Sequence, residues 1–296
     1  MLDVQEIAKA YRGKVVLNGI SFGIAAGTVY GLLGPNGAGK TTAISILSGL
    51  MPPDRGTVWV NGVVLSRRCR PWIGVAPQGN IFYRHLTCAE NLRFFARIYG
   101  VPEERCRKNI YHVLDLVGLM PQAQHPAHTL SGGMLRRLNL AIALVHQPRL
   151  LILDEPSTGL DLEARQALWQ LVEHLRAEGM AILLTTHLLD EAERLCQLIG
   201  ILKDGTLLCQ GTMAELRQII AAAEIVQISS SECPRAIARA QELGLTYRLY
   251  GPELIIWLPQ TMPLRQILDQ FDGIALEAVR RQPVTLEHIY REVTAS

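Results

Sequence analysis

A glycine-rich loop with a fixed spacing constrains the fold of this chain more than any other segment. Residues Gly34–Thr41 read GPNGAGKT, which fits G-x-x-x-x-G-K-[ST], and they lie between an expected strand, Thr28–Leu33, and an expected helix, Thr42–Leu47. Glycines let backbone N–H groups turn inward around phosphate oxygens, and the start of the helix adds its positive dipole end. Lys40 can reach the β- and γ-phosphates, and the Thr41 hydroxyl can ligate Mg²⁺. This phosphate loop therefore predicts a nucleotide site; a glycine-rich turn without a ligand is the alternative.

Two adjacent carboxylates form the second feature that points to chemistry. They end the apolar run Leu150–Glu155, which reads LLILDE. Two acids at the end of a buried strand are unfavourable unless a cation or a catalytic task holds them. At the C-terminal end of a parallel strand Asp154 would face the Mg²⁺ ion on Thr41. Glu155 would then be placed to polarise an attacking water as a general base. A surface turn after a strand is the alternative.

A second loop suited to bind phosphate, and thus a second cradle for phosphate oxygens, lies at the start of a later helix. Residues Leu130–Met134 read LSGGM, so that a hydroxyl and two glycines precede the expected helix Leu135–Val145. One nucleotide rarely needs two such cradles. The simplest physical account is that two copies of the chain face each other and that each cradle closes the partner's phosphate loop. The next two arginines, Arg136 and Arg137, are expected on the exposed face of this helix.

The order of the expected elements indicates an α/β fold. Apolar strands alternate with amphipathic helices, which predicts a parallel sheet covered on both faces. The N-terminal part reads as short strands with a hairpin signal at Asn61-Gly62, and helical periodicity starts near Ala89. The C-terminal part predicts a small α+β domain with a split βαβ arrangement. The expected division is 1–220 and 225–296, with a helical subdomain at about 80–145.

Composition and charge exclude several classes of protein. Lys and Arg number 29 and Asp and Glu 27, so the net charge of +2 gives no electrostatic reason to expect a nucleic-acid partner. The six cysteines form no C-x-x-C pair, which argues against a zinc site or a disulfide framework and favours a reducing compartment. No run reaches the roughly 18 apolar residues of a membrane span, and the N-terminus has no signal-peptide pattern. We therefore expect any contact with a membrane to be made from outside the lipid.

In this order, the motifs resemble those of the ATP-binding subunit of an ABC transporter. The phosphate loop is similar to the Walker A motif, Leu150–Glu155 to Walker B with its catalytic glutamate, and Leu130–Met134 to the signature loop. Single residues match four further positions: Gln78 the Q-loop glutamine, Asp161 the D-loop, His187 the switch histidine and Tyr11 the aromatic that stacks on adenine. The resemblance covers about residues 1–220. Met134 departs from the family pattern, which usually has glutamine there.

The resemblance implies a P-loop NTPase cassette with a parallel core sheet, an antiparallel β subdomain and a helical subdomain, followed by the small C-terminal domain. Its cofactors would be ATP and Mg²⁺. Glu155, His187 and Gln78 would act in ATP hydrolysis. Mg²⁺ would be held by Thr41, Gln78 and Asp154. The residues expected on ATP are Tyr11, Gly34, Pro35, Asn36, Gly37, Ala38, Gly39, Lys40, Thr41, Thr42, Ser131, Gly132, Gly133 and Asp161.

Each minor motif also has a purely structural interpretation when it is taken alone. Gln78 could be a polar loop residue, His187 a structural histidine and Tyr11 a core aromatic. Asp161 could be the N-cap of the helix expected from Glu163. Only their order and spacing together favour the functional interpretation.

The resemblance also implies partners and a place in the cell. The chain would form a homodimer, or pair with an equivalent cassette, and drive a separate integral-membrane permease from the cytoplasmic side of the cell membrane. The tail from Pro283 to Glu292 resembles that of ABC-2-type exporter subunits, the group of drug-resistance and nodulation exporters, which implies export.

The expected docking surface for the permease lies in the helical subdomain. The segment Asn80–Gly118 would receive a coupling helix, with Phe82, Tyr83 and the Leu92/Phe95 face as candidates. Packing inside the subdomain is the alternative role of these side chains. Two other functions compete with transport: a soluble ABC ATPase of translation or DNA maintenance, and a scaffold that binds ATP without turnover. Tandem cassettes or coiled-coil insertions are usual in the former, and neither is apparent here.

Overall fold

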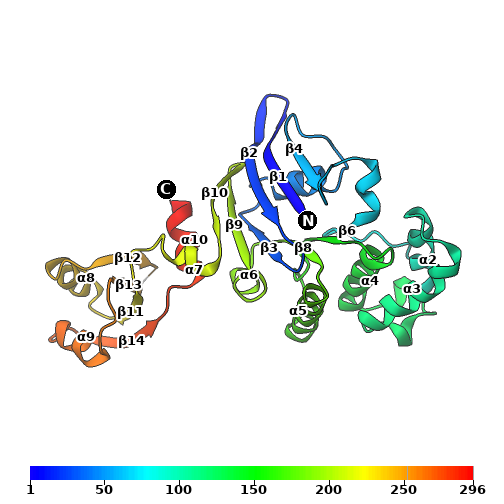
Figure 1. The fold of residues 1–296 in the computed structure, drawn as a ribbon. Helices are drawn as coiled ribbons and strands as arrows, with labels where there is room; N and C mark the ends of the chain where they lie inside the picture. Colours follow the sequence, from blue (N-terminus) through cyan, green and yellow to red (C-terminus); the bar gives the residue numbers. More distant parts are fainter. Residues whose placement is uncertain (252, 296) are drawn as a thin grey trace. The chain divides into compact units, whose positions relative to one another are not determined.

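The computed structural model describes residues 1–251 and 253–295, which divide into two compact units, Met1–Thr212 and Met213–Ser296 (Figure 1). The division falls earlier than the expected end of the first domain at residue 220. The reason is the short helix α7 (Met213–Arg217), which packs against α10 (Leu286–Ala295) of the second unit. Arg217 also donates from Nε to the Val284 carbonyl oxygen at 2.9 Å.

A six-stranded sheet forms the centre of the first unit. Its strands, in spatial order, are β10 (Thr206–Gly211), β9 (Leu198–Lys203), β3 (Val29–Leu33), β8 (Ala181–Thr186), β7 (Leu150–Asp154) and β6 (Ile73–Ala76). β10 runs antiparallel to β9, and the other neighbouring pairs are parallel. Every residue of β3, β7 and β8 is buried, as continuous apolar runs in a covered parallel sheet require. The expected α/β core is confirmed.

An antiparallel sheet shares its core with the central sheet. Its strands, in spatial order, are β2 (Lys14–Ile24), β1 (Leu2–Tyr11), β4 (Arg55–Val60) and β5 (Val63–Val64). One continuous cluster of buried apolar side chains joins the two sheets, and within it the rings of Phe22 and Tyr30 stack with centroids 4.6 Å apart. The expected hairpin is present between β4 and β5, where Asn61 and Gly62 have φ angles of 53° and 76°.

Helices connect the strands of this unit. They are α1 (Lys40–Leu47), α2 (Cys88–Ile98), α3 (Glu103–Leu116), α4 (Gly132–Leu144), α5 (Leu162–Ala177) and α6 (Leu189–Leu195), with 3-10 turns at Arg67–Trp72, Met120–Gln122 and Ala127–Thr129. The helical periodicity that begins near Ala89 belongs to two helices, because Gly100 with φ 73° and Pro102 separate α2 from α3. None of the helices in the described residues has the length and apolar character needed to cross a bilayer.

The second unit is an antiparallel sheet with helices and a core of its own. Its elements follow the order β11 (Glu224–Ser230), α8 (Cys233–Glu242), β12 (Thr246–Tyr250), β13 (Glu253–Leu258), α9 (Leu264–Gln270) and β14 (Leu276–Gln282). The spatial order β12-β13-β11-β14 is that of a split βαβ arrangement, as expected. Side chains of the sheet, such as Val226 and Ile256, pack with Ala236 of α8 and Ile267 of α9.

The end of α4 packs closely on β6. A Cβ atom at Gly74 would collide with the Ala143 carbonyl oxygen, so this approach depends on glycine. His146, just beyond α4, donates from Nε2 to the Ile73 carbonyl oxygen at 3.0 Å, and its ring stacks on Tyr99 with centroids 3.7 Å apart. Burial lowers the pKa of His146 from 6.5 to about 4, because the interior disfavours the imidazolium.

The stability of the first unit is expected to fall in acid through His146. As the pH falls, His146 takes up a proton near pH 6.5 in the unfolded chain but only near pH 4 in the folded chain. Its contribution to the free energy of unfolding is therefore fully present above pH 6.5 and is lost between pH 6.5 and 4, by up to about 3 kcal/mol. The measurement is the free energy of unfolding in urea at several pH values. His146→Phe keeps a stacked ring but cannot titrate. An equal pH dependence in both proteins would contradict the assignment.

Candidate functional site

A cleft of about 530 Å³ opens where the phosphate loop meets the carboxyl end of β7. Most of the expected site residues line it: Pro35, Asn36, Gly37, Gly39, Lys40, Thr41, Thr42, Gln78, Asp154, Glu155 and His187. Two residues that the sequence analysis did not single out, Val16 and Thr158, line it as well. Segments far apart in the sequence therefore meet around one space.

The phosphate loop is shaped by its glycines. Gly39 has φ 111°, and a Cβ atom there would come within 2.7 Å of the Val16 carbonyl oxygen, so a larger residue would be both strained and obstructed. α1 begins at the next residue, Lys40, whose ammonium is buried and donates to the carbonyl oxygens of Gly34 at 2.6 Å and Pro35 at 3.2 Å. The loop thus holds a buried cation and the N-terminus of a helix on the same side of the cleft.

The Glu155 carboxylate is the meeting point of the other polar side chains. It is only 9% exposed. Its Oε1 atom lies 3.6 Å from Lys40 Nζ. Its Oε2 atom accepts from Gln78 Nε2 and Thr158 Oγ1, each at 3.3 Å. His187 Nδ1 lies 3.3 Å from the same oxygen. Three of the expected site residues therefore surround the expected general base, in a partly desolvated environment where such contacts are strengthened.

Thr185 orders both carboxylates from the neighbouring strand. It pairs with Asp154 in the parallel register of β7 and β8, and its hydroxyl donates to Asp154 Oδ1 at 2.6 Å. Its carbonyl oxygen accepts from the backbone N–H of Glu155 at 3.0 Å. Glu155 itself has φ 46°, a left-handed conformation that is uncommon outside glycine. This turn directs the glutamate away from the strand and into the cleft.

The oxygen donors of the cleft fit a magnesium ion that is also bound by phosphates. Thr41 offers a hydroxyl, Asp154 a carboxylate and Gln78 an amide oxygen, and all three line the cleft. Within residues 1–251 and 253–295, no three His, Cys, Asp or Glu side chains form a metal-binding group. Mg²⁺ tolerates such a sparse protein set because it prefers oxygen ligands and keeps water and phosphate in its coordination sphere.

Seven expected nucleotide contacts are not among the residues that line this cleft: Tyr11, Gly34, Ala38, Ser131, Gly132, Gly133 and Asp161. Ser131 and Gly132 are exposed at the start of α4, where Ser131 Oγ accepts from the Met134 N–H at 3.4 Å. Asp161 is exposed and is the N-cap of α5, since it accepts from the Ala164 N–H at 2.8 Å. Tyr11 is 42% exposed, with its hydroxyl 3.1 Å from the Met51 sulfur. Their contacts with nucleotide remain predictions.

The structure corrects the expectation for both arginines of α4, since Arg137 is half-buried as well as Arg136. Arg136 does not lie on an exposed face: it is half-buried, and its guanidinium donates to backbone carbonyl oxygens next to the cleft. Thr158 and Thr185 were also missed. The signal for Thr185 was present, because a hydroxyl ends the apolar strand that precedes His187. Thr158 and Arg136 have no comparable local signal, since their partners come from distant segments.

We expect Thr185→Val to weaken binding of magnesium with nucleotide. Valine keeps the volume of the buried side chain but removes the donor to Asp154 Oδ1, and loss of such an outer hydrogen bond typically lowers metal affinity about 10-fold or more. The measurement is a Mg²⁺ titration of a bound fluorescent ATP analogue. Thr185→Ser, which retains the hydroxyl, is the control. Equal Mg²⁺ affinity in the valine variant and the wild type would refute this role.

Comparison with known proteins agrees with this site. A family model described as ABC transporter matches residues 17–158. The Nod factor export ATP-binding protein I of Ralstonia nicotianae is 35% identical over 300 residues, which cover 99% of this chain and 94% of that protein. The linearmycin resistance ATP-binding protein LnrL of Bacillus subtilis is 41% identical over 234 residues, 78% of this chain and 75% of that protein.

A solved structure with the same fold extends the comparison. It is a dimeric ATP-binding cassette in a post-hydrolysis state bound to ADP and Pi, 25% identical, with a TM-score of 0.66. The match covers 72% of this chain and 99% of that one. The phosphate loop, the paired carboxylates and a relative that is similar over nearly the whole length lead to one conclusion. This chain belongs to the ABC transporter family, as one of its ATP-binding, ATP-hydrolysing subunits.

Proposed function

We propose that two copies of this chain enclose ATP and Mg²⁺ and that hydrolysis drives export through a separate integral-membrane subunit. The observation that carries the proposal is the convergence of Lys40, Gln78 and His187 on the Glu155 carboxylate in the cleft beside the phosphate loop. A mere phosphate-binding loop would not require this arrangement. A carboxylate within reach of a cation, an amide and an imidazole is suited to orient and deprotonate a water.

Six side chains of the cleft would have roles in this reaction. Lys40 and the first turn of α1 would hold the β- and γ-phosphates. Thr41, Asp154 and Gln78 would hold Mg²⁺, which neutralises charge that develops on the phosphates. Glu155 would accept a proton from water aligned with the γ-phosphate. His187, exposed at the mouth of the cleft, would donate a hydrogen bond to the γ-phosphate.

The signature loop supports a dimer. Ser131 and Gly132 are exposed and lie apart from the cleft of their own chain, although a hydroxyl and a helix N-terminus are suited to bind phosphate. In a two-fold dimer each such loop can face the cleft of the other chain. The related cassette structure described above is dimeric. Ser131 would then stabilise the γ-phosphate held by the partner chain, and Asp161 would lie near the same junction.

Glu155→Gln is expected to bind ATP but not to turn it over. Glutamine keeps the size and most of the contacts of Glu155 but cannot accept the proton, so turnover should fall about 100-fold or more and an ATP-bound dimer should accumulate. The measurements are ATPase rate and mass by size exclusion with light scattering in ATP and Mg²⁺. Lys40→Ala, which should lose ATP affinity, is the control. A Glu155→Gln variant that stays monomeric with ATP bound would contradict the dimeric site.

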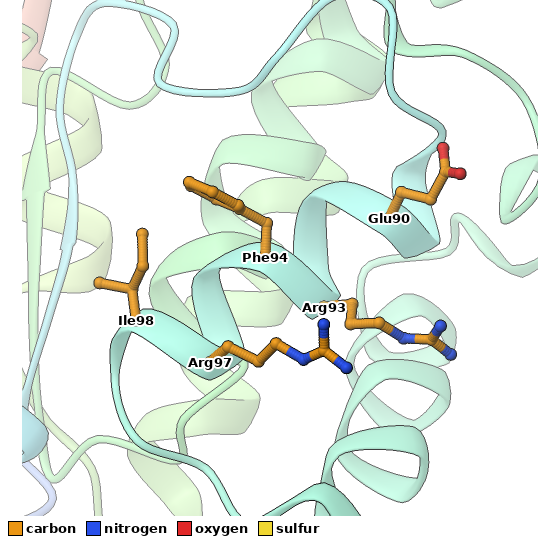
Figure 2. A pocket seen from close by; sticks show the side chains of 5 residues that line it. All are labelled: Glu90, Arg93, Phe94, Arg97 and Ile98. Carbon is orange, nitrogen blue, oxygen red and sulfur yellow. The ribbon is translucent and has the colours of Figure 1, made fainter.

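A groove on α2 is a candidate docking surface for the membrane subunit (Figure 2). Phe94 and Ile98, which are 38% and 62% exposed, project from one side of α2, and Arg93 and Arg97 reach along the other. The exposed ring of Tyr83 packs edge-on against Phe94 with centroids 4.8 Å apart. The groove therefore combines exposed aromatic and aliphatic surface with two guanidinium groups.

The structure also divides the residues that the sequence suggested for this role. Phe82 and Leu92 are buried and pack inside the helical subdomain, as the alternative interpretation held. Tyr83 stays on the surface, and Phe95 is partly buried. We propose that a cytoplasmic helix of the membrane subunit occupies this groove. Its apolar residues would pack against Phe94 and Ile98, and a carboxylate would pair with Arg93. This contact would keep the chain at the cytoplasmic side of the membrane.

Export is the direction that the relatives support. One relative is named for Nod factor export and another for linearmycin resistance. The match to the Nod factor exporter covers 99% of this chain, and thus includes the second unit as well as the cassette. The cassette residues described above would contact nucleotide, whereas the membrane subunit would contact the cargo.

Ile98→Asp is expected to separate the chain from its membrane subunit. An aspartate at this position would place a carboxylate against the apolar residues of the bound helix and would lose the apolar contact of Ile98, which should reduce co-purification with the co-expressed membrane subunit about 10-fold. The ATP affinity of the purified chain should not change, since no residue of α2 lines the cleft. Val64→Asp, at a similarly exposed apolar position on β5, is the matched control. Full co-purification of Ile98→Asp would exclude this surface.

A further inference from the structure

Arg136 occupies an unusual position for an arginine in the helix that begins with the signature loop. Its guanidinium donates four hydrogen bonds, all to backbone carbonyl oxygens. Nη1 donates to Gln78 at 2.7 Å and to Pro77 at 3.3 Å. Nη2 donates to Glu155 at 2.8 Å, and Nε donates to Pro156 at 3.0 Å. One side chain of α4 thus joins the loop after β6 to the loop after β7.

These four carbonyl groups belong to the segments that present the catalytic side chains. Gln78 and Glu155 are bonded to each other at 3.3 Å through their side chains, and both would face the attacking water in the proposed reaction. Arg136 bonds the backbone of the same two residues from behind. The guanidinium therefore fixes the separation of the two chain segments whose side chains must meet in the cleft.

Glu155 needs such support because of its backbone. Its φ of 46° is a conformation that persists only when the surroundings hold it. On one side its N–H donates to the Thr185 carbonyl oxygen at 3.0 Å. On the other side its carbonyl oxygen accepts from Arg136. The same oxygen also accepts from the Thr158 N–H at 3.3 Å, so removal of the Arg136 bond would leave the peptide after Glu155 held by that longer bond alone and would loosen the position of the carboxylate.

The chemistry of the site requires an arginine. A planar guanidinium can donate in several fixed directions at once, whereas a lysine ammonium is a compact group with three donors. Burial lowers the pKa of Arg136, while the charges of Asp154, Glu155 and Glu191 act in the opposite direction. A positive charge behind two carboxylates also offsets the repulsion between them.

A second residue of α4 acts on the same loop. Asn139, one turn further along, is fully buried, donates to the Gly79 carbonyl oxygen at 3.0 Å and accepts from the Ile81 N–H at 3.2 Å. The residues after Gln78 are thus bonded to α4 at successive points. The neighbouring Arg137 lies elsewhere, beside Asp115 and Gly118, away from the cleft.

We infer that Arg136 is a positioning residue for ATP hydrolysis. From the signature helix, its guanidinium holds the Glu155 carboxylate and Gln78 in the correct relative position. The inference rests on the proposed role of Glu155 as the base. Because Arg136 is not among the residues that line the cleft and its guanidinium bonds only backbone carbonyl oxygens, it would act on the chemical step and not on ATP binding. It also ties the first turns of α4, which carry the exposed signature loop, to the catalytic carboxylate of the same chain.

The test is steady-state ATP hydrolysis by the full chain with Arg136→Gln, Arg136→Lys and Arg137→Gln. For Arg136→Gln, kcat should fall about 10- to 100-fold, as for a misplaced catalytic group, while KM and ATP affinity stay within about twofold of the wild type. Arg136→Lys should recover part of kcat, because it retains the charge and some of the donors. Arg137→Gln should resemble the wild type.

A double-mutant cycle separates positioning from a general loss of structure. If Arg136 acts through Glu155, adding Arg136→Gln to Glu155→Gln should change the residual turnover by less than about threefold. Equal losses in both backgrounds, a raised KM with unchanged kcat, or the same loss in Arg137→Gln would overturn the inference. Full turnover in Glu155→Gln alone would instead show that the proposed function of the base has failed.

Discussion

The burial of two adjacent carboxylates at the end of β7 is the constraint on which the rest of the cassette depends. A carboxylate with 9% exposure is stable only when cations and hydrogen-bond donors surround it. Thr185 supplies a donor to Asp154 from the next strand, and Lys40 supplies a cation near Glu155 from the start of α1. These partners are far apart in the sequence. The strand order β3-β8-β7 is therefore what brings them to one edge.

Features that are encoded locally could be predicted from the sequence. The spacing of Gly34–Thr41 is enough to define a loop between a strand and a helix, and Asn61-Gly62 is enough for a hairpin. Contacts set by tertiary register could not be predicted. Arg136 looks like a solvent-exposed helix residue until β6 and β7 are placed against α4. The same limit explains why Leu92, which is buried, was suggested for a docking surface. Helical periodicity shows that a helix has an apolar face, but it does not show whether that face is packed inside the protein or exposed.

The helix α4 has two segments with different roles. Its N-terminal residues, from Ser131, are exposed and form a cap that is suited to a phosphate outside the chain's own cleft. One turn later Arg136 and Asn139 bond the loops that follow β6 and β7. Since the same helix carries both, a displacement of its exposed end would also move the arginine that bonds the backbone of Glu155. Packed elements of this kind switch between two discrete arrangements more readily than they deform continuously.

At Glu155 the left-handed backbone conformation lowers folding stability, whereas the side chain is needed for activity. A non-glycine residue in this region costs about 1–3 kcal/mol, and glycine or asparagine would relax it. Either change would also remove the carboxylate that the cleft is built around. Selection for heat resistance alone would therefore favour sequences that are easier to fold and unable to hydrolyse ATP. A glutamate at this position in an active enzyme is thus evidence that turnover, and not stability, determines which residue the turn after β7 carries.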